Sequence, residues 1–178
     1  PVRTFIYSSM RRVSAALMIA CAAQSGWAAG FQRLDAGAQY RDAVIEPLGS
    51  AAYAAAYNAN EVRRIALPTG EQTGAVPVSA GPVAVALSAD GTLLASVGRL
   101  TGDVTLVRVP EMEVLATAPC GKGACAVAAL PGNGFAVANS FNDTLAIIDP
   151  SRPDAPVILS NVSSVPMAVA ASESYLAE

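Results

Sequence analysis

Histidine is absent from all 178 residues of the sequence. A Ser-His-Asp triad, a Cys-His dyad and a metal site with histidine ligands are therefore excluded within this stretch of chain. Charged residues are also scarce, at 14% of the chain, where soluble domains carry about 25%. We accordingly assign no catalytic residue, no metal and no cofactor from the sequence.

Positive charge is thinly spread. The chain has 11 lysine and arginine residues against 14 acidic ones, a net charge of −3, and no run of basic residues. Nucleic acid is not expected as a partner, because its binding depends on clustered cations. Aromatic residues make up 6% of the chain, whereas 53% of residues are apolar and 37 are alanine. This composition excludes a disordered chain, and the length suits one domain.

The segment Met10–Ala28 has the three-part layout of a secretory signal peptide. Arg11 and Arg12 follow the methionine, Val13–Ala23 forms an apolar run, and small residues come after it. A run of about eleven residues is too short to span a membrane, which takes about 20, so no membrane span is expected. We predict a signal peptide at 10–28, with residues 1–9 translated from upstream of the true start.

Cys21 offers a second interpretation of the same segment. The tetrapeptide Met18-Ile19-Ala20-Cys21 resembles a bacterial lipobox, in which the cysteine is acylated and becomes the mature N-terminus. Methionine matches the first lipobox position poorly, so cleavage after Ala28 is favoured. A lipid anchor at Cys21 stays open as the minor alternative.

An internal repeat organises the rest of the chain. The tripeptide Ala-Val-Ala occurs at 84–86, 126–128 and 168–170, so each copy follows the last at a constant 42-residue interval. Pro82 and Pro166 stand two residues ahead of the first and third copies, and Ala124 holds that place in the middle one. A period of this size is typical of repeat architectures.

Apolar and β-branched runs within each repeat alternate with Gly, Pro, Asn and Asp turns, which predicts strands. The expected strands lie at 83–87, 92–97, 104–109 and 113–118, then at 125–129, 135–139, 144–148 and 156–159. An earlier and less regular copy has runs at 51–57 and 61–67. Ala51–Ala56 is a good helix former by propensity, but the repeat register favours a strand there.

Four short strands per unit, with a period of about 40–50 residues, are typical of a β-propeller blade. We predict an all-β fold: about three four-stranded antiparallel blades of a seven-bladed ring, preceded by the signal peptide. Such a ring would need about 294 residues, so 29–178 is expected to be the N-terminal portion of a larger propeller. Its repeats fall near 43–81, 82–123, 124–165 and 166–178, the last one truncated.

The stretch Ala136–Asp149 reads AVANSFNDTLAIID and resembles the YVTN-type β-propeller repeat, YVTNSGSDTVSVID. It departs from that repeat at Ala136, where the family has an aromatic residue, and at Phe141, where the family has a turn glycine. The matching positions are Val137, Asn139, Ser140, Asp143, Thr144, Ile148 and Asp149. The resemblance covers about 43–178 and implies an exported protein in a family that includes binding proteins, surface-layer proteins and lactonase-like enzymes.

Candidate site residues come from the loops where propellers usually bind ligands. These loops join the second to the third strand, and the outer strand to the next inner strand. The candidates are Arg99, Asp103, Lys122, Asn139 and Asp143. Arg99 and Lys122 could meet an anionic ligand, whereas Asn139 and Asp143 bracket a turn and are expected to act mainly on the backbone. Solvated loop charge is the simpler alternative.

Cys120 and Cys125 are separated by Gly-Lys-Gly-Ala. Two cysteines this close in an exported protein favour a disulfide that clamps the crossover between two blades. Free thiols are one alternative, and a redox or metal pair is another, although more ligands would be needed for a metal.

Two classes of function remain open. The first is a binding or protein-interaction scaffold in the periplasm or on the cell surface, for an unknown protein or a small anionic ligand. The alternative is a lactonase-like hydrolase or a redox-associated propeller enzyme with active residues partly in missing blades. The expected inner strands carry no carboxylate, which favours the scaffold.

The export hypothesis predicts a defined N-terminus. The mature protein should begin at Ala29, because the apolar run ends in small residues suited to cleavage. Mass spectrometry of the exported protein measures this directly. An intact Met10 terminus would rule out export, and a lipidated Cys21 would replace cleavage after Ala28 by lipoprotein processing.

Overall fold

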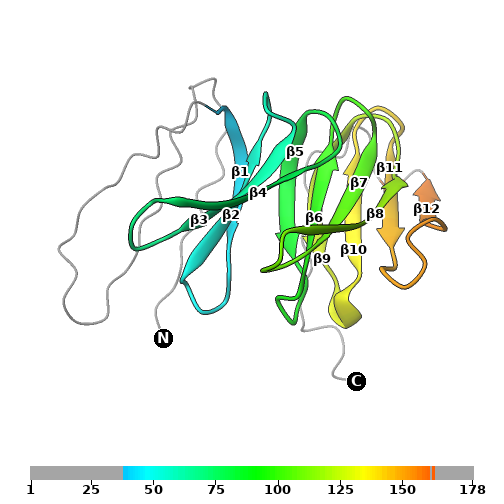
Figure 1. Cartoon of the computed structure of the whole chain (residues 1–178). Coiled ribbons are helices and arrows are strands. Elements are labelled where there is room, and N and C mark those ends of the chain that lie inside the picture. Colours follow the sequence, from blue (N-terminus) through cyan, green and yellow to red (C-terminus); the bar gives the residue numbers. More distant parts are fainter. Residues whose placement is uncertain (1–37, 161, 163–178) are drawn as a thin grey trace.

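The computed structural model describes residues 38–160 and 162 and confirms the all-β class (Figure 1). These residues form three separate sheets, each with four antiparallel strands in sequence order. The predicted signal peptide at 10–28, Cys21 and the repeat copy at 166–178 lie outside the described residues.

The first sheet, sheet I, consists of β1 (Tyr40–Ile45), β2 (Ala51–Ala56), β3 (Glu61–Ala66) and β4 (Gln72–Pro77). Sheet II consists of β5 (Pro82–Leu87), β6 (Leu93–Gly98), β7 (Asp103–Arg108) and β8 (Glu113–Pro119). Sheet III consists of β9 (Ala124–Ala129), β10 (Phe135–Asn139), β11 (Thr144–Ile148) and β12 (Val157–Ser160). A short 3-10 turn, η1 (Pro131–Asn133), links β9 to β10.

The eight strands predicted for the two central repeats are present in sheets II and III, with ends within about one residue of those expected. The strand expected at Ala51–Ala56 is β2, and all six of its residues are buried. Burial between neighbouring strands therefore overrides the helix propensity of alanine there. Two strands of sheet I, β1 and β4, were not anticipated, and the sheet begins at Tyr40 rather than near residue 43.

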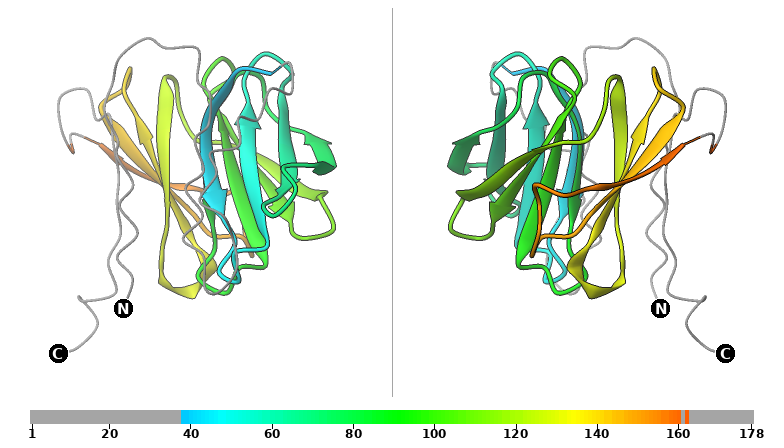
Figure 2. Two further views of the ribbon diagram at one scale, coloured as in Figure 1. Left: turned by 90° about the vertical axis from the view of Figure 1, so that its left-hand side faces the viewer. Right: turned by 90° about the vertical axis from the view of Figure 1, so that its right-hand side faces the viewer.

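The three sheets follow the 42-residue period in detail. Tyr40, Pro82 and Ala124 each open the first strand of a sheet, and a β-bulge follows directly at each of these places. The first strands also lie close together, with β5 beside both β1 and β9. The two side views of Figure 2 show the sheets stacked one after another.

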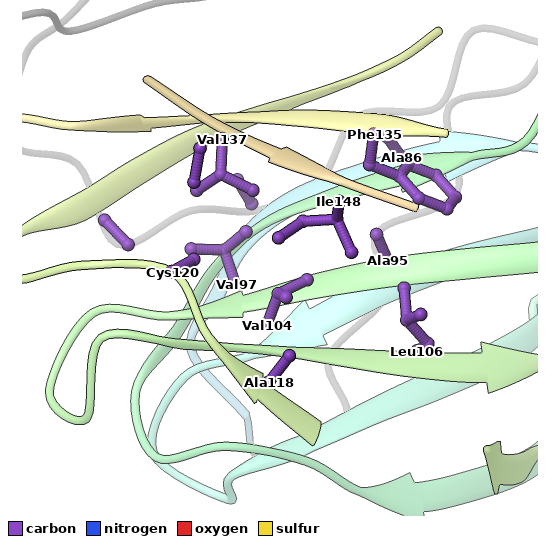
Figure 3. Packing of buried hydrophobic residues seen from close by; sticks show 13 residues of the cluster. Ala86, Ala95, Val97, Val104, Leu106, Ala118, Cys120, Phe135, Val137 and Ile148 are labelled. Carbon is purple, nitrogen blue, oxygen red and sulfur yellow. The ribbon is translucent and has the colours of Figure 1, made fainter. Parts of the chain in front are cut away.

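The hydrophobic core is made of two layers between neighbouring sheets. Between sheets II and III, Val97, Val104 and Leu106 meet Phe135 and Ile148 (Figure 3). Between sheets I and II, a second cluster joins residues of both sheets, among them Tyr53, Val62, Val85, Leu94 and Val107.

Alanine explains how closely the first strands approach. On β5, Ala84 and Ala86 face sheet III, and β9 lies directly beside that strand. Larger apolar side chains stand on the second and third strands, where the sheets diverge. The alanine-rich composition is therefore a packing requirement near the centre of the stack, because interiors are filled to high density.

Phe135 and Phe141 offer a matched test of this core. Phe135 is completely buried, whereas the side chain of Phe141 is 70% exposed. We expect Phe135→Ala to lower the free energy of unfolding by about 3–5 kcal/mol, because it leaves a cavity between sheets II and III. Phe141→Ala should cost less than about 1 kcal/mol. Urea denaturation measures both, and equal losses would contradict the assigned core.

Candidate ligand-binding face

Five loops meet at one end of the sheet stack, which we call the crossover end. Three are turns between the second and third strands, at 57–60, 99–102 and 140–143. Two are crossovers from the outer strand of one sheet to the first strand of the next, at 78–81 and 120–123. All five sequence-predicted site residues lie in or next to these loops.

Backbone hydrogen bonds tie each crossover to the turn of the sheet before it. The carbonyl of Asn60 accepts from Val78 N–H at 2.9 Å, and the carbonyl of Gly102 accepts from Cys120 N–H at 2.9 Å. Both accepting residues have positive φ, 56° for Asn60 and 76° for Gly102. The left-handed conformation turns the chain sharply, and Asn and Gly tolerate it best.

The turn of the following sheet then binds back to the same crossover. Arg99 N–H donates to Gly81 O at 3.0 Å, and Ser140 N–H donates to Gly123 O at 3.0 Å. The three loops 99–102, 120–123 and 140–143 are therefore fixed to one another and form a continuous surface.

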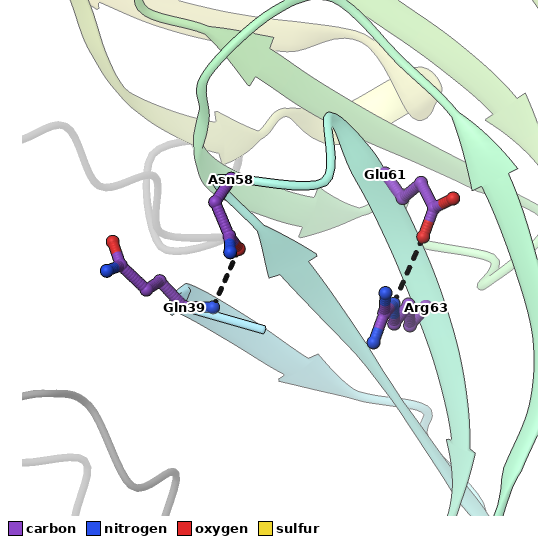
Figure 4. Close-up of polar contacts among 4 residues, drawn as sticks. All are labelled: Gln39, Asn58, Glu61 and Arg63. Carbon is purple, nitrogen blue, oxygen red and sulfur yellow. Dashed lines mark hydrogen bonds and ion pairs between the residues drawn. The ribbon is translucent and has the colours of Figure 1, made fainter. Parts of the chain in front are cut away.

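The turn of sheet I is held in a related way near the start of β1. Tyr57 N–H donates to Gln39 O at 2.9 Å, and Asn58 Oδ1 accepts from Gln39 N–H at 2.8 Å (Figure 4). Next to it, Glu61 and Arg63 form an ion pair at 3.1 Å, also drawn in Figure 4.

Asn139 is completely buried and so does not face the solvent, although it was a candidate for the ligand face. Its Nδ2 donates to the Cys120 carbonyl at 2.6 Å and to Thr144 Oγ1 at 3.1 Å. The amide also lies against Gly121, where an added Cβ would come within 2.8 Å of Nδ2. Asn139 therefore holds the crossover in place, in agreement with the backbone role expected for it.

Arg99 lies at the surface of the crossover end and stacks on Phe141. Its guanidinium carbon is 5.5 Å from the ring centroid. The ring itself rests on Gly123, whose φ is 74°, and an added Cβ there would come within 2.5 Å of Phe141 Cγ. Glycine is therefore needed at position 123 for two reasons: its backbone has a positive φ, and the Phe141 ring lies too close to leave room for a side chain.

A second stack, which sequence reasoning missed, stands at sheet I. The guanidinium carbon of Arg41 is 4.7 Å from the centroid of the Tyr57 ring. Both Tyr57 and Leu100 lie against Gly81, and the side chain of Leu100 is 68% exposed. The signal that could have revealed this pair is the 42-residue period, in which residue 57 is the position equivalent to residue 99.

The remaining predicted site residues occupy different settings. Lys122 is exposed in the crossover 120–123. Asp103 is half-buried at the start of β7, near enough to the Cys120 thiol to affect its pKa. Asp143 closes the turn 140–143 with a φ of 53°, the bracketing role expected for it.

The predicted disulfide between Cys120 and Cys125 is not formed in the structure. The Cys120 thiol is buried in the core between sheets II and III and donates to Gly102 O at 3.3 Å. Cys125 lies in the β-bulge of β9, where its thiol donates to Ala138 O at 3.4 Å. Closeness in sequence therefore does not bring the sulfurs together, because each bonds to the carbonyl of a different sheet.

Burial, with a smaller effect from the Asp103 charge, raises the pKa of the Cys120 thiol to about 12. The thiol therefore stays protonated at neutral pH and is a poor nucleophile. In the part of the chain that the structure describes, no group of three or more His, Cys, Asp or Glu side chains could hold a metal ion.

Charge is segregated between the two ends of the stack. The five loops of the crossover end carry Arg99, Lys122 and Asp143, with Arg41 stacked beside them and Asp103 directly after the loop 99–102. The turns described at the opposite end carry one arginine, Arg152, and six carboxylates: Glu46, Glu71, Asp90, Glu111, Asp149 and Asp154. Among the described turns, Arg99 and Lys122 thus lie at the crossover end and Arg152 lies at the opposite end.

At the opposite end, Asp90 does more than form the hairpin turn expected of Asp90-Gly91. Its Oδ1 accepts from Ser88 Oγ at 2.7 Å and from Thr92 N–H at 2.9 Å. Its Oδ2 accepts from Asn133 Nδ2 at 2.6 Å, which links the turns of sheets II and III. The Ser88 hydrogen bond and those from Thr92 and Asn133 hold the pKa of Asp90 well below its ordinary value.

Asp42 on β1 corrects the expectation that the inner strands carry no carboxylate. Its Oδ2 accepts from Val85 N–H of β5, and its Oδ1 accepts from Ala43 N–H, both at 2.9 Å. Burial raises the pKa of Asp42 despite these two hydrogen bonds. The carboxylate joins two first strands and gives sheets I and II a polar link near the centre of the stack.

Several solved structures are similar to this chain. The chain is similar to hydrazine synthase from Kuenenia stuttgartiensis, at a TM-score of 0.67 and 20% identity over 72% of this chain. The fold is that of a β-propeller. This confirms the predicted fold class, and the three sheets are propeller blades.

Two further propellers are similar to the chain. The WD40 repeats of RRP9 match with a TM-score of 0.65 and 18% identity over 74% of this chain. A streptogramin B lyase matches with a TM-score of 0.66 and 14% identity over 78% of this chain. The chain spans 38%, 42% and 46% of hydrazine synthase, RRP9 and the lyase, which is less than half of each.

No protein-family model and no curated protein matches the chain. Identities of 14–20% support the fold alone, because propellers serve many unrelated functions. Among the described residues, no helix is long and apolar enough to cross a membrane.

Asn139 and Asn142 provide a matched pair in one turn. Asn139→Ala should lower the free energy of unfolding by about 1–2 kcal/mol, because the buried carbonyl of Cys120 loses its donor. We expect a loss in the lower part of the range for a buried group that loses its partner. The reason is that Asn139→Ala also removes Asn139 Oδ1, a buried atom that has no hydrogen-bond partner among the described residues. Asn142 is exposed, so Asn142→Ala should change little. Urea denaturation of both variants checks this, and equal stabilities would refute the anchoring role.

Proposed function

We propose that this chain belongs to an exported β-propeller repeat protein of the YVTN type, which binds an anionic ligand or an acidic protein through the crossover end. The observation that carries the proposal is the segregation of charge between the two ends. Exposed cations stand at one end, on a frame of fixed loops, and carboxylates fill the turns at the other.

The composition of the crossover end suits recognition. Arg99 and Arg41 are each stacked on an aromatic ring, which orders the side chain before a ligand arrives. Phe141 and Leu100 are exposed beside them. Arginine and aromatic residues are the types enriched in protein interfaces, and a preordered side chain loses less entropy on binding.

Electrostatic steering supports the same face. A cluster of cations on a chain of net charge −3 favours the approach of an anion to that cluster. Such complementarity mainly raises the rate of association and fixes the orientation of the partner.

The periplasm or the cell surface is the proposed location. It rests on the signal-like segment at 10–28 and on the resemblance of 136–149 to the YVTN repeat. A lactonase-like hydrolase or redox-associated enzyme is the second candidate, and two of the similar structures are enzymes by name. We favour binding because the one inner-strand carboxylate described, Asp42, already accepts two backbone hydrogen bonds.

The test compares two double variants that remove the same charge. Arg99→Ala with Lys122→Ala removes the two cations in the loops of the crossover end, and Arg108→Ala with Arg152→Ala removes two exposed cations elsewhere. The probes are poly-L-glutamate for an acidic protein and citrate for a small anion, titrated against the protein by fluorescence at low ionic strength. The first double variant should bind about tenfold more weakly, and the second should bind like the wild type.

Equal weakening by both double variants would show that net charge alone governs binding, and the proposed face would be wrong. Failure of both probes to bind the wild-type protein would also reject an anion-binding function. Hydrolysis of γ-butyrolactone by the same preparation would favour the enzyme instead.

A further inference from the structure

Side chains from all three sheets meet in a row across the crossover end. Positions 57, 99 and 141 are one 42-residue period apart and are occupied by Tyr57, Arg99 and Phe141. Each of them lies in the turn between the second and third strands of its sheet. The guanidinium carbon of Arg99 is 5.5 Å from the centroid of the Phe141 ring. Equivalent positions of sheets II and III are therefore in contact.

The row continues from sheet II to sheet I over Gly81. An added Cβ at Gly81 would come within 2.7 Å of Leu100 Cγ and 3.1 Å of Tyr57 Cε2, so both side chains rest on this glycine. Arg41 stacks on the Tyr57 ring, with 4.7 Å from its guanidinium carbon to the centroid. The members of the row, in order, are Arg41, Tyr57, Leu100, Arg99 and Phe141. Each of its two cations thus stands beside aromatic or apolar groups.

Charge alone gives the crossover end little selectivity. The cations in and beside its five loops are Arg41, Arg99 and Lys122, and the carboxylates are Asp103 and Asp143. Three cations exceed two carboxylates by a single charge. Because an ion pair in contact with water contributes only about 0–1 kcal/mol, a small anion gains little from this surface.

The remaining part of the row is apolar and open to solvent. The side chain of Leu100 is 68% exposed and that of Phe141 is 70% exposed. Complete burial of one large apolar side chain contributes about 1.5–3 kcal/mol, which is more than an exposed ion pair contributes. Arginine beside exposed aromatic and apolar groups is typical of surfaces that bind proteins. The row therefore suits a partner that brings apolar side chains together with negative charge.

We propose that the partner of the crossover end is an acidic protein segment in which an aromatic or aliphatic side chain stands beside carboxylates. The apolar side chain packs on Leu100 and Phe141, and a carboxylate accepts hydrogen bonds from Arg99, since a guanidinium stacked on a ring still presents N–H donors at its edge. The proposal rests on the proposed anion-binding function and selects an acidic protein over a small anion.

The test uses three five-residue peptides, titrated into the full chain by calorimetry at low ionic strength. The first peptide has a central phenylalanine between two pairs of glutamates, the second has alanine at its centre, and the third has lysines in place of the glutamates. The first should bind at least about tenfold more tightly than the second, because only phenylalanine can cover Leu100 and Phe141. It should also bind at least about tenfold more tightly than the third.

Two double variants locate the apolar contact. Leu100→Ala with Phe141→Ala removes the two exposed apolar side chains of the row, and Leu48→Ala with Leu115→Ala removes two exposed apolar side chains elsewhere. The first double variant should bind the phenylalanine and alanine peptides equally. The second should keep the preference of the wild type. A preference that survives Leu100→Ala with Phe141→Ala would overturn the proposal.

The wild-type chain alone separates this proposal from the function on which it rests. Equal binding of the two glutamate peptides would overturn the proposal and leave anion binding standing. Equal binding of the lysine peptide would overturn both. If neither glutamate peptide binds, the proposal is wrong, and titration with citrate then decides whether anion binding remains.

An anionic lipid surface and a second copy of the chain are the competing partners. Binding to phosphatidylglycerol vesicles that is lost in Leu100→Ala with Phe141→Ala would assign the row to a lipid surface. A dimer in sedimentation velocity that the same double variant abolishes would assign the row to a second copy. Either result would overturn the proposal, whereas a monomeric chain that binds the phenylalanine peptide and no vesicles supports it.

Discussion

The backbone hydrogen bond from each crossover to the turn before it is the contact on which the rest of this structure depends. Cys120 N–H to Gly102 O, and Val78 N–H to Asn60 O, set where the next sheet begins. Once the crossover is fixed, the first strand of the next sheet must lie against the previous sheet. The left-handed residue in the turn is what aims its carbonyl at the crossover, so a local backbone conformation decides how whole sheets stack.

The same contact creates the candidate binding face. Loops are usually the mobile parts of a fold, but here four of them are joined to one another by hydrogen bonds to the carbonyls of Gly81, Gly102 and Gly123. Arg99 and Phe141 are therefore displayed on a stiff platform, although both lie in loops. Structural anchors and exposed recognition groups alternate along one short stretch, with buried Asn139 only two residues from exposed Phe141.

Much of the fold follows from local patterns. Turn residues and β-branched runs mark the eight strands of sheets II and III, because these signals depend on neighbours in sequence. β1 and β4 have weak patterns: β1 contains Arg41 and Asp42, and β4 is mostly exposed. Their strand structure comes from pairing with β2 and β3. The presence of Arg99 and Lys122 together at the crossover end was predictable from the period, because the period determines which loops lie at the same end of the sheets.

The sequence by itself determined the 42-residue period, the strand class and the set of loops that gather at the crossover end. Only the tertiary structure decided what each side chain meets there. Asn139 is buried and Phe141 is exposed, Arg41 joins the face from β1, and Cys120 and Cys125 bond to different carbonyls. The reason is physical: strand formation depends on adjacent residues, whereas these contacts join residues about 13 to 42 positions apart in sequence. Such residues meet only when strands pair and sheets stack.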